Sequence, residues 1–331
     1  MKEWRNLPYE QMLKAATAFI QKHDRFLIVS HVNPDGDAIS STLAVAYMLK
    51  QLGKTYIAVN EDDIPERFRY LWGYEDWLRT EQLPPDAVYD AVISVDCADY
   101  ARIGTLKDRL SPATPHLNID HHSTNNGFGS EVLIREEAAA TAEILDDLAD
   151  FLGVTWSKDL ADCIYTGLLT DTGGFRYSNT SPAVLRKASR LVERGVQASE
   201  LAQCLLEQIT SAHVQLLQRA LSRLAFEFDG KLAWIYVTLQ DIAETKASNE
   251  DLEGLVNYPK NIEGVETGML LKEVSEGVYK ASLRSHAIVD VAKVAQQFGG
   301  GGHKRAAGCT IEGTLQEAAE QLVKEVGLVL K

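Results

Sequence analysis

Histidine and aspartate side chains gather in four short segments that lie far apart in the sequence. The first contains His31, Asp35 and Asp37 in the run HVNPDGD, between an apolar stretch at 26–29 and a helical pattern at 38–52. These side chains therefore fall on a strand-to-helix turn, where α/β sheets bind ligands. One imidazole and two carboxylates crowded at such a turn repel one another unless a cation lies between them. The segment predicts a metal site.

Three further segments repeat this pattern of metal-capable side chains after an apolar run. They are Asp96 after an apolar strand, Asp120-His121-His122 after a second, and Asp171 at the end of a helical pattern. Each alone is explained as readily by a helix cap or a surface turn. Strand-end residues of a parallel sheet, however, converge on one edge, and burying so many carboxylates without a counter-ion costs more than a fold tolerates. The four segments together predict one metal centre.

The donor atoms indicate which ion and which reaction to expect. Oxygen and nitrogen donors without a thiolate suit Mn²⁺ or Mg²⁺ better than a structural zinc ion. The candidate ligands outnumber those that one octahedral ion needs, which favours two ions roughly 3.5–4 Å apart with a shared carboxylate. Such a pair lowers the pKa of a bridging water and holds phosphoryl oxygens, so phosphoester hydrolysis is the expected reaction class.

Length and charge limit the alternatives. A chain of 331 residues is longer than most single cores, which predicts two domains. Its 33 basic and 47 acidic residues give a net charge of −14, which argues against a partner that is a long nucleic-acid duplex or an anionic membrane. The four cysteines lack CxxC spacing, so neither a zinc ribbon nor a disulfide framework is indicated. No signal-peptide core or membrane-spanning run is evident, and we expect a cytoplasmic protein.

The elements that must position the metal centre alternate between strands and helices. We expect strands at 26–31, 55–60, 91–96 and 116–120 and helices at 9–23, 38–52, 138–152 and 158–170. This alternation predicts an α/β catalytic domain over 1–185, with a mostly parallel sheet and helices on both faces.

The second half has a different order of predicted helices and strands. Residues 182–226 are helical in pattern without a strand candidate, which predicts a helical connector over 186–225. Beyond it we expect strands at 232–238, 265–273 and 278–284 and helices at 249–256, 289–297 and 315–326. These elements predict a smaller α/β domain over 226–331.

A run of four glycines at 299–302 precedes three basic or imidazole side chains in the second domain. Such a run makes a poor helix or strand but lets backbone N–H groups approach an anion, whereas bare polyglycine is more often a loop. The basic residues that follow favour a phosphate clamp, and Arg284 offers a cation for a second phosphate unless it is simply a solvated arginine. The candidate substrate-binding residues are Arg284, Gly300, Gly301, Gly302, His303 and Arg305.

These motifs resemble a known family. Asp120-His121-His122 after an apolar strand, with His31, Asp35 and Asp37 upstream, resembles the signature of the DHH phosphoesterase superfamily. The glycine run with His303 is similar to the GGGH motif of the DHHA1 domain that accompanies it. Together the two signatures cover nearly the whole chain. In length the chain resembles members of the stand-alone branch, which are oligoribonucleases that also remove the 3′-phosphate of 3′-phosphoadenosine 5′-phosphate (pAp).

The resemblance implies roles for the metal-centre residues. One ion would be held by His31, Asp35 and Asp96. The other would be held by Asp37, Asp96, His121 and Asp171, so that Asp96 bridges. His122 would face the scissile phosphate as a catalytic residue, and Asp120 would anchor the histidines. Two divalent ions are implied, with Mn²⁺ expected and Mg²⁺ or Co²⁺ as alternatives.

The resemblance also implies substrates. It implies 3′–5′ hydrolysis of short RNA oligonucleotides, dinucleotides or pAp in a cleft between the domains, and it allows a homodimer. Phe175, Tyr177 and Tyr258 are the aromatic candidates for stacking on a base, and the sequence does not select between them.

Three alternative functions stay open. The first is a phosphodiesterase of cyclic di-AMP or of linear dinucleotides. The second is a manganese inorganic pyrophosphatase, whose Ser-Arg-Lys-Lys stretch is absent here. The third is a non-catalytic nucleotide sensor, which would be expected to have lost a metal ligand.

Overall fold

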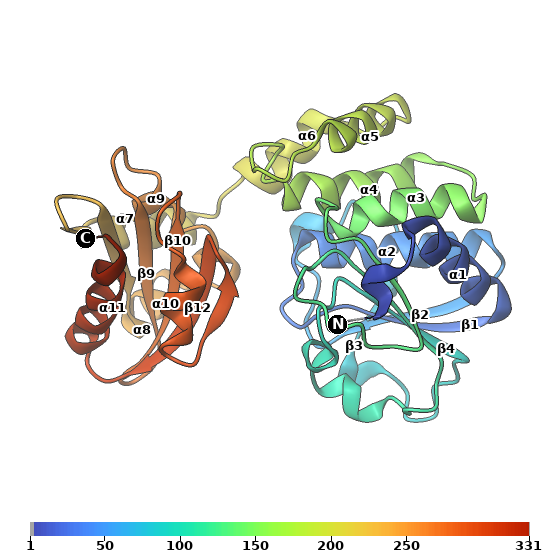
Figure 1. The fold of residues 1–331 in the computed structure, drawn as a ribbon, viewed down its shortest axis with the longest axis horizontal. Helices are drawn as coiled ribbons and strands as arrows, with labels where there is room; N and C mark the ends of the chain where they lie inside the picture. The colour runs from blue at the N-terminus through green and yellow to red at the C-terminus, as the bar shows by residue number, and fades with distance from the viewer. Residues whose placement is uncertain (1–2, 331) are drawn as a thin grey trace. The chain divides into compact units, whose positions relative to one another are not determined.

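The computed structural model describes residues 3–330, which form two compact units. The N-terminal unit ends at Gln208 and the C-terminal unit begins at Ile209 (Figure 1). No helix between residues 3 and 330 is both long and apolar enough to cross a lipid bilayer.

The N-terminal unit contains a six-stranded sheet in which every neighbouring pair is parallel, with the order β3-β2-β1-β4-β5-β6. Its strands are β1 (Arg25–Val29), β2 (Thr55–Asn60), β3 (Trp77–Arg79), β4 (Ala91–Val95), β5 (His116–Asp120) and β6 (Glu131–Ile134). The predicted parallel sheet is confirmed. The two edge strands β3 and β6 were not predicted, because three or four residues carry too little apolar pattern.

Both faces of this sheet are covered. Phe26 and Ile28 of β1 belong to the larger core cluster, which also includes α-helical side chains, whereas Leu27 and Val29 belong to a second cluster on the other face. The helices are α1 (Tyr9–Lys22), α2 (Gly36–Gln51), α3 (Thr141–Leu152), α4 (Lys158–Asp171), α5 (Pro182–Glu193) and α6 (Ala198–Ala202). The second face is covered mainly by a 3₁₀ segment, Tyr100–Arg109, through Ile103 and Leu106.

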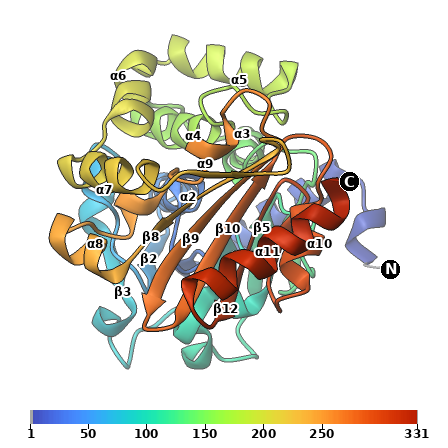
Figure 2. The same cartoon turned by 90° about the vertical axis from the view of Figure 1, so that its left-hand side faces the viewer.

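The C-terminal unit contains a second six-stranded sheet, with the order β11-β12-β10-β9-β8-β7. Its strands are β7 (Ala225–Glu227), β8 (Leu232–Val237), β9 (Thr267–Ser275), β10 (Val278–Ser285), β11 (Gly301–His303) and β12 (Ala306–Glu312). The β8–β9 pair is parallel and the others are antiparallel. Helices α10 (Val291–Gln296) and α11 (Leu315–Leu330) pack on one face (Figure 2), while α7 (Ser211–Leu221) and α8 (Leu239–Thr245) pack on the other.

Three expectations for the second half differ from the structure. The predicted connector 186–225 is divided between the units, because Ala188 and Leu191 of α5 are buried in the N-terminal core while Leu216 of α7 is buried against the C-terminal sheet. The predicted helix at 249–256 is reduced to a 3₁₀ turn at Glu250–Leu252, followed by the short α9 (Asn257–Lys260).

The glycine run is the third difference, since part of it forms the edge strand β11 rather than an irregular loop. Gly302, with φ of 140°, pairs with Ala307 of β12. A Cβ at Gly302 would lie 2.5 Å from the Ala306 carbonyl oxygen, so only glycine permits this close pairing. The pairing partner, which local pattern cannot reveal, decides the conformation.

Candidate metal centre

The predicted chemistry-bearing residues of the N-terminal unit lie together at the carboxyl ends of β1, β4 and β5, which are neighbours in the sheet. Asp96 directly follows β4, Asp120 ends β5, and Asp171 ends α4. The full set brought together is His31, Asp35, Asp37, Asp96, Asp120, His121, His122 and Asp171. The parallel strands therefore position this set as the sequence predicts.

Asp96 lies at the centre of the set and is buried, with 1% of its surface exposed. Its carboxylate oxygens lie 3.3 Å from His31 Nε2, 3.6 Å from His121 Nε2 and 3.5 Å from His122 Nδ1. The Thr141 hydroxyl donates a hydrogen bond of 2.9 Å to it. Asp96 thus contacts all three histidines of the set.

Backbone carbonyls orient two of these imidazoles. His31 Nδ1 lies 2.9 Å from the Val32 carbonyl, and His121 Nδ1 lies 3.2 Å from the Ala138 carbonyl. With Nδ1–H donating to a carbonyl, Nε2 would be the lone-pair donor to a metal once the ring is neutral. In both histidines Nε2 faces the carboxylates, which is the orientation that a metal ligand requires.

Asp37 is held by the N-terminus of α3. It accepts backbone N–H groups from Thr141 at 2.6 Å and Ala142 at 3.0 Å, and the Ser41 hydroxyl at 3.1 Å. A Cβ at Gly167 of α4 would lie 2.4 Å from the Asp37 carboxylate. The helix terminus and the close approach of α4 therefore fix this buried carboxylate in one position.

The carboxylates of the set differ in the direction in which their surroundings shift the pKa. Burial, together with the charges of Asp96 and Asp35, raises the pKa of Asp37 well above its ordinary value. Burial and the charges of Asp37 and Asp35 likewise raise the pKa of Asp171. These carboxylates lack enough positive charge from the protein itself, so the donor set fits divalent cations.

Burial also raises the pKa of Asp96, but the hydrogen bond from His31 and the charges of His122 and His121 outweigh it. The net effect holds the pKa of Asp96 below its ordinary value.

Three groups of donor atoms have members that all lie within 4.8 Å of one another. They are His31 with Asp35 and Asp96, Asp37 with His121 and Asp171, and Asp96 with His121 and His122. The first group has the composition that the resemblance implies for one ion, and the second contains three of the four residues implied for the other. The third group includes His122, for which the resemblance implies contact with the phosphate instead. The ligand assignments stay predictions.

His122 is fixed through its Nδ1, which donates to Asp120 at 2.8 Å. The other carboxylate oxygen of Asp120 accepts from Asn125 at 2.5 Å. Burial lowers the pKa of His122, but the hydrogen bond to Asp120 and the charge of Asp96 raise it to a net value of about 9. Asp120 and Asn125 therefore fix the His122 ring, and the charges of Asp120 and Asp96 favour its protonated form in the metal-free protein.

Several supporting residues escaped the sequence analysis. Glu143 is 4% exposed, accepts the Ala139 N–H at 2.8 Å, and forms an ion pair of 2.5 Å with Arg135. Together with Thr141 it fixes segment 138–142, which supplies the contacts to Asp37, Asp96 and His121. In the sequence these residues only interrupt an apolar helical pattern, so no local signal distinguishes them.

The candidate substrate-binding residues of the C-terminal unit lie on the interior strand β10, on the edge strand β11 and next to β11. Arg284 of β10 and His303 of β11 both pair with Ala306 of β12, so the three residues share one row and one face of the sheet. Arg305 instead donates from Nη1 to the Val289 carbonyl at 3.0 Å and from Nη2 to the Ala287 carbonyl, which holds the loop after β10. A substrate role for these residues, and a site between the units, stay predictions.

Comparison with known proteins adds independent findings. Residues 25–168 match the model of the DHH family, N-terminal domain, and residues 229–331 match that of the DHHA1 domain. The chain is 37% identical over 321 residues to the bifunctional oligoribonuclease and PAP phosphatase NrnA of Thermus thermophilus, covering 96% of this chain and 94% of the relative.

Solved structures give the same result for the fold. An exopolyphosphatase-related protein from Bacteroides fragilis has a TM-score of 0.90 at 27% identity, with 97% of each chain covered. RecJ from Thermus thermophilus, solved in complex with Mn²⁺, has a TM-score of 0.57 at 14% identity over 97% of this chain and 55% of its own. The second similarity concerns the fold alone.

Proposed function

The chain belongs to the DHH family and carries a DHHA1 domain, and from this premise we propose that it hydrolyses short oligoribonucleotides from the 3′ end and removes the 3′-phosphate of pAp. The observation that carries the proposal is the arrangement around Asp96, whose carboxylate contacts three imidazoles beside two carboxylates with raised pKa. The printed name of the Thermus relative, which shares 37% identity over nearly full length, supports the substrate class.

The donor set supports divalent metal ions as the cofactor. One ion would be held by His31, Asp35 and Asp96, and a second by Asp37, His121 and Asp171 with Asp96 shared between them. Oxygen and imidazole donors suit Mn²⁺ or Mg²⁺, and we take Mn²⁺ as the working ion. Two such ions would supply an activated water and would neutralise charge on the phosphoryl oxygens.

The residues of the chain would then act on the bond between phosphorus and the ribose 3′-oxygen. In both reactions water oxygen replaces the 3′-oxygen on phosphorus, and the departing oxygen takes a proton. Because its Nδ1 donates to Asp120, a protonated His122 would carry its second proton at Nε2. Asp120 and Asn125 fix its ring, and in the proposed reaction His122 would transfer this proton to a phosphoryl oxygen or to the leaving group.

The second domain would bind the far end of the substrate. Arg284 and His303 share one sheet face, and Gly301 and Gly302 belong to the same strand as His303. Arg305 is the weakest member of the predicted set, because backbone carbonyls already occupy its guanidinium. A net charge of −14 disfavours long RNA, which supports substrates of a few nucleotides.

A turnover panel tests the proposal. The full chain is assayed with Mn²⁺ on pAp, on di- to pentaribonucleotides, on a long RNA, on cyclic di-AMP and on pyrophosphate. We expect pAp and the short oligonucleotides to be hydrolysed at least about tenfold faster than the others. Faster turnover of cyclic di-AMP or of pyrophosphate would instead support one of the two alternative hydrolases. The His122→Asn variant, assayed alongside, is expected to lose most of its turnover while it retains metal.

A further inference from the structure

The backbone directly after the metal-centre residue Asp171 has an unusual conformation. Three consecutive residues adopt left-handed φ values, which are 56° at Gly173, 73° at Gly174 and 61° at Phe175. Phenylalanine is rarely found in this region, and strained residues of this kind cluster at functional sites. The run bends the chain back so that residues 175–177 return toward the end of α4.

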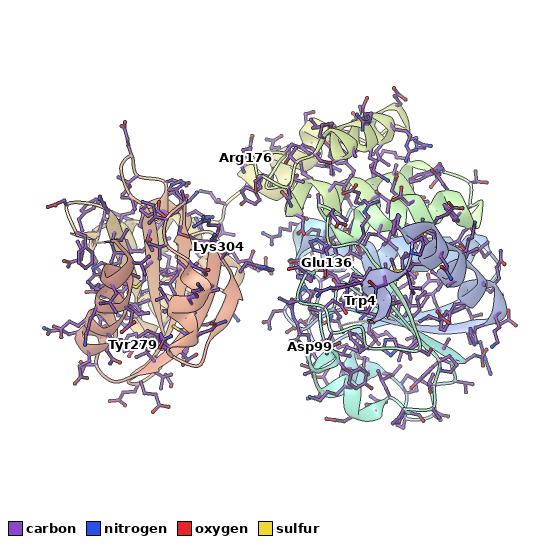
Figure 3. All side chains as sticks on the ribbon, in the orientation of Figure 1. Trp4, Asp99, Glu136, Arg176, Tyr279 and Lys304 are labelled. Carbon is purple, nitrogen blue, oxygen red and sulfur yellow. The ribbon has the colours of Figure 1, made fainter. Side chains whose placement is uncertain are left out.

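Hydrogen bonds fix this turn around Thr172, which is fully buried. The Thr172 hydroxyl accepts the Phe175 N–H at 2.9 Å, and its carbonyl accepts the N–H groups of Arg176 at 2.9 Å and Tyr177 at 3.0 Å. Arg176, labelled in Figure 3, donates from Nε to the Gly173 carbonyl at 2.5 Å. The turn is therefore held in one conformation.

The same turn is tied to the metal centre. The Asn179 side-chain amide donates 3.1 Å hydrogen bonds to the carbonyl of Asp171 and to that of Ala139. Ala139 belongs to the segment that supports Asp37 and Asp96. The position of residues 172–179 is thus coupled directly to the position of the metal ligands.

Tyr177 is the side chain that this turn presents. A Cβ at Gly173 would lie 2.3 Å from Tyr177 Cζ and 2.6 Å from both Cε atoms. Near-equal distances to the two Cε atoms, with Cζ closest, place one face of the ring against Gly173, so a larger residue at this position would displace the ring. The side chain is nevertheless exposed, with 55% of the residue surface accessible. One face of the ring therefore contacts Gly173, and the side chain is open to solvent.

The other aromatic candidates lie in different surroundings. Phe175 packs edge-on against Tyr165, with ring centroids 5.8 Å apart, and contributes to the core. Tyr258 belongs to the C-terminal unit, where its ring lies 6.4 Å from that of His213. Of the three, Tyr177 alone combines an exposed ring with a rigid connection to a metal-centre residue.

We propose that Tyr177 is the platform on which an unpaired nucleobase of the substrate stacks while its phosphate lies at the metal centre. The inference rests on the proposed function and adds a base subsite to it. Because every base has an aromatic face, stacking is tolerant of sequence, as the degradation of arbitrary short oligonucleotides requires. Hydrogen bonds order the backbone that carries the ring before binding, which lowers the entropic cost of forming the stack.

Steady-state kinetics of the full chain with Mn²⁺ test the proposal. The substrates are a diribonucleotide and two analogues in which one or the other nucleotide lacks its base. Tyr177→Ala is expected to raise KM for the intact dinucleotide by about tenfold, with kcat within about twofold, because stacking affects binding rather than the reacting bond. For the analogue that lacks the stacked base, Tyr177→Ala should leave KM unchanged. Tyr177→Phe keeps the ring and should behave as the wild type.

Phe151→Ala serves as the control, because it removes an exposed aromatic ring at the end of α3 opposite to the one that contacts the metal centre. Its KM should equal that of the wild type. The proposal is overturned if Tyr177→Ala leaves KM for the intact dinucleotide unchanged, or if it raises KM equally for the intact substrate and both analogues. Absence of hydrolysis by the wild type would instead refute the proposed function.

Discussion

Two buried carboxylates of the N-terminal unit and two of the C-terminal unit have opposite electrostatic environments. In the N-terminal unit, burial and neighbouring carboxylates raise the pKa of Asp37 and of Asp171. In the C-terminal unit, the pKa values of Asp241 and Glu266 are lowered, because hydrogen bonds to each carboxylate outweigh the effect of burial. The first pair lacks compensating charge, whereas the second pair is compensated by the protein.

The contacts explain the difference. Asp241 forms an ion pair of 2.5 Å with Arg223 and accepts hydrogen bonds from the backbone and hydroxyl of Thr238. Glu266 accepts three backbone N–H groups from residues 287–289. Asp171, in contrast, faces an imidazole at 3.3 Å and further carboxylates. Compensated carboxylates stabilise a fold, and uncompensated ones mark a site prepared for an external cation.

Matched substitutions in the two units should give the largest contrast. Asp96→Asn removes the carboxylate shared by two ligand groups, and we expect turnover to fall by about 10³-fold or more. Asp241→Asn should leave turnover of the folded enzyme within about twofold and lower stability by about 2 kcal/mol, because a charge-assisted hydrogen bond is lost. Kinetics and urea unfolding of both variants check this. Near-normal turnover in Asp96→Asn would contradict the metal-centre assignment.

A smaller effect is expected from a compensated carboxylate that supports the metal centre. Glu143→Gln weakens the ion pair with Arg135 and loosens segment 138–142, so metal affinity should fall by about 10–100-fold. Calorimetric titration with Mn²⁺ measures the change. Glu136→Gln, which loses only a surface ion pair with Arg5, is the control and should bind metal normally. Equal affinities in both variants would show that segment 138–142 does not depend on Glu143.

Neutralising an uncompensated carboxylate should stabilise the metal-free protein. A folded-state pKa raised above 3.8 means that ionised Asp171 costs stability, and the cost grows as pH rises through the folded-state pKa. Asp171→Asn should therefore raise metal-free stability at pH 7 by about 1 kcal/mol, and Mn²⁺ should stabilise it less than the wild type. Thermal unfolding with and without Mn²⁺ provides the measurement. Asp159 is an exposed residue at the other end of α4, and Asp159→Asn should not raise the stability of the metal-free protein. A loss of metal-free stability in Asp171→Asn would refute the idea of uncompensated charge.

The smallest effect concerns Glu266, whose pKa shift has the opposite sign. Its folded-state pKa lies below 4.5, so its stabilising contribution is present above pH 4.5 and is lost as pH falls through the folded-state pKa. Glu266→Gln should destabilise the C-terminal unit by about 1 kcal/mol at pH 7, and the difference from wild type should shrink toward pH 3. Hydrogen exchange of β9 and β10 amides reports this. A difference that grows on acidification would contradict the sign.

Much of the N-terminal unit could be predicted because short stretches of sequence indicate its strands and the residues that end them. The strands β1, β2, β4 and β5 are apolar runs, and Asp96 and Asp120 follow from their places at strand ends. Support for the metal centre could not be predicted, since Asn125 also bonds the Cys97 carbonyl 28 residues away and Glu143 accepts a backbone N–H group, and neither contact has a sequence pattern.

The C-terminal unit was predicted less completely for the same reason. The strand β11 exists because β12 pairs with it, although its glycines disfavour a strand on their own. The conformation that separates Tyr177 from Phe175 depends on the buried Thr172, which the sequence presents only as one residue in a polar turn.

The number of Mn²⁺ ions retained per chain tests the central claim most directly. Equilibrium dialysis of the full chain should find two ions on the wild type, and Asp96→Asn should lose affinity for both, because the family resemblance implies that this carboxylate is shared by the two ions. Retention of two ions by Asp96→Asn with wild-type affinity, or of none by the wild type, would contradict the account.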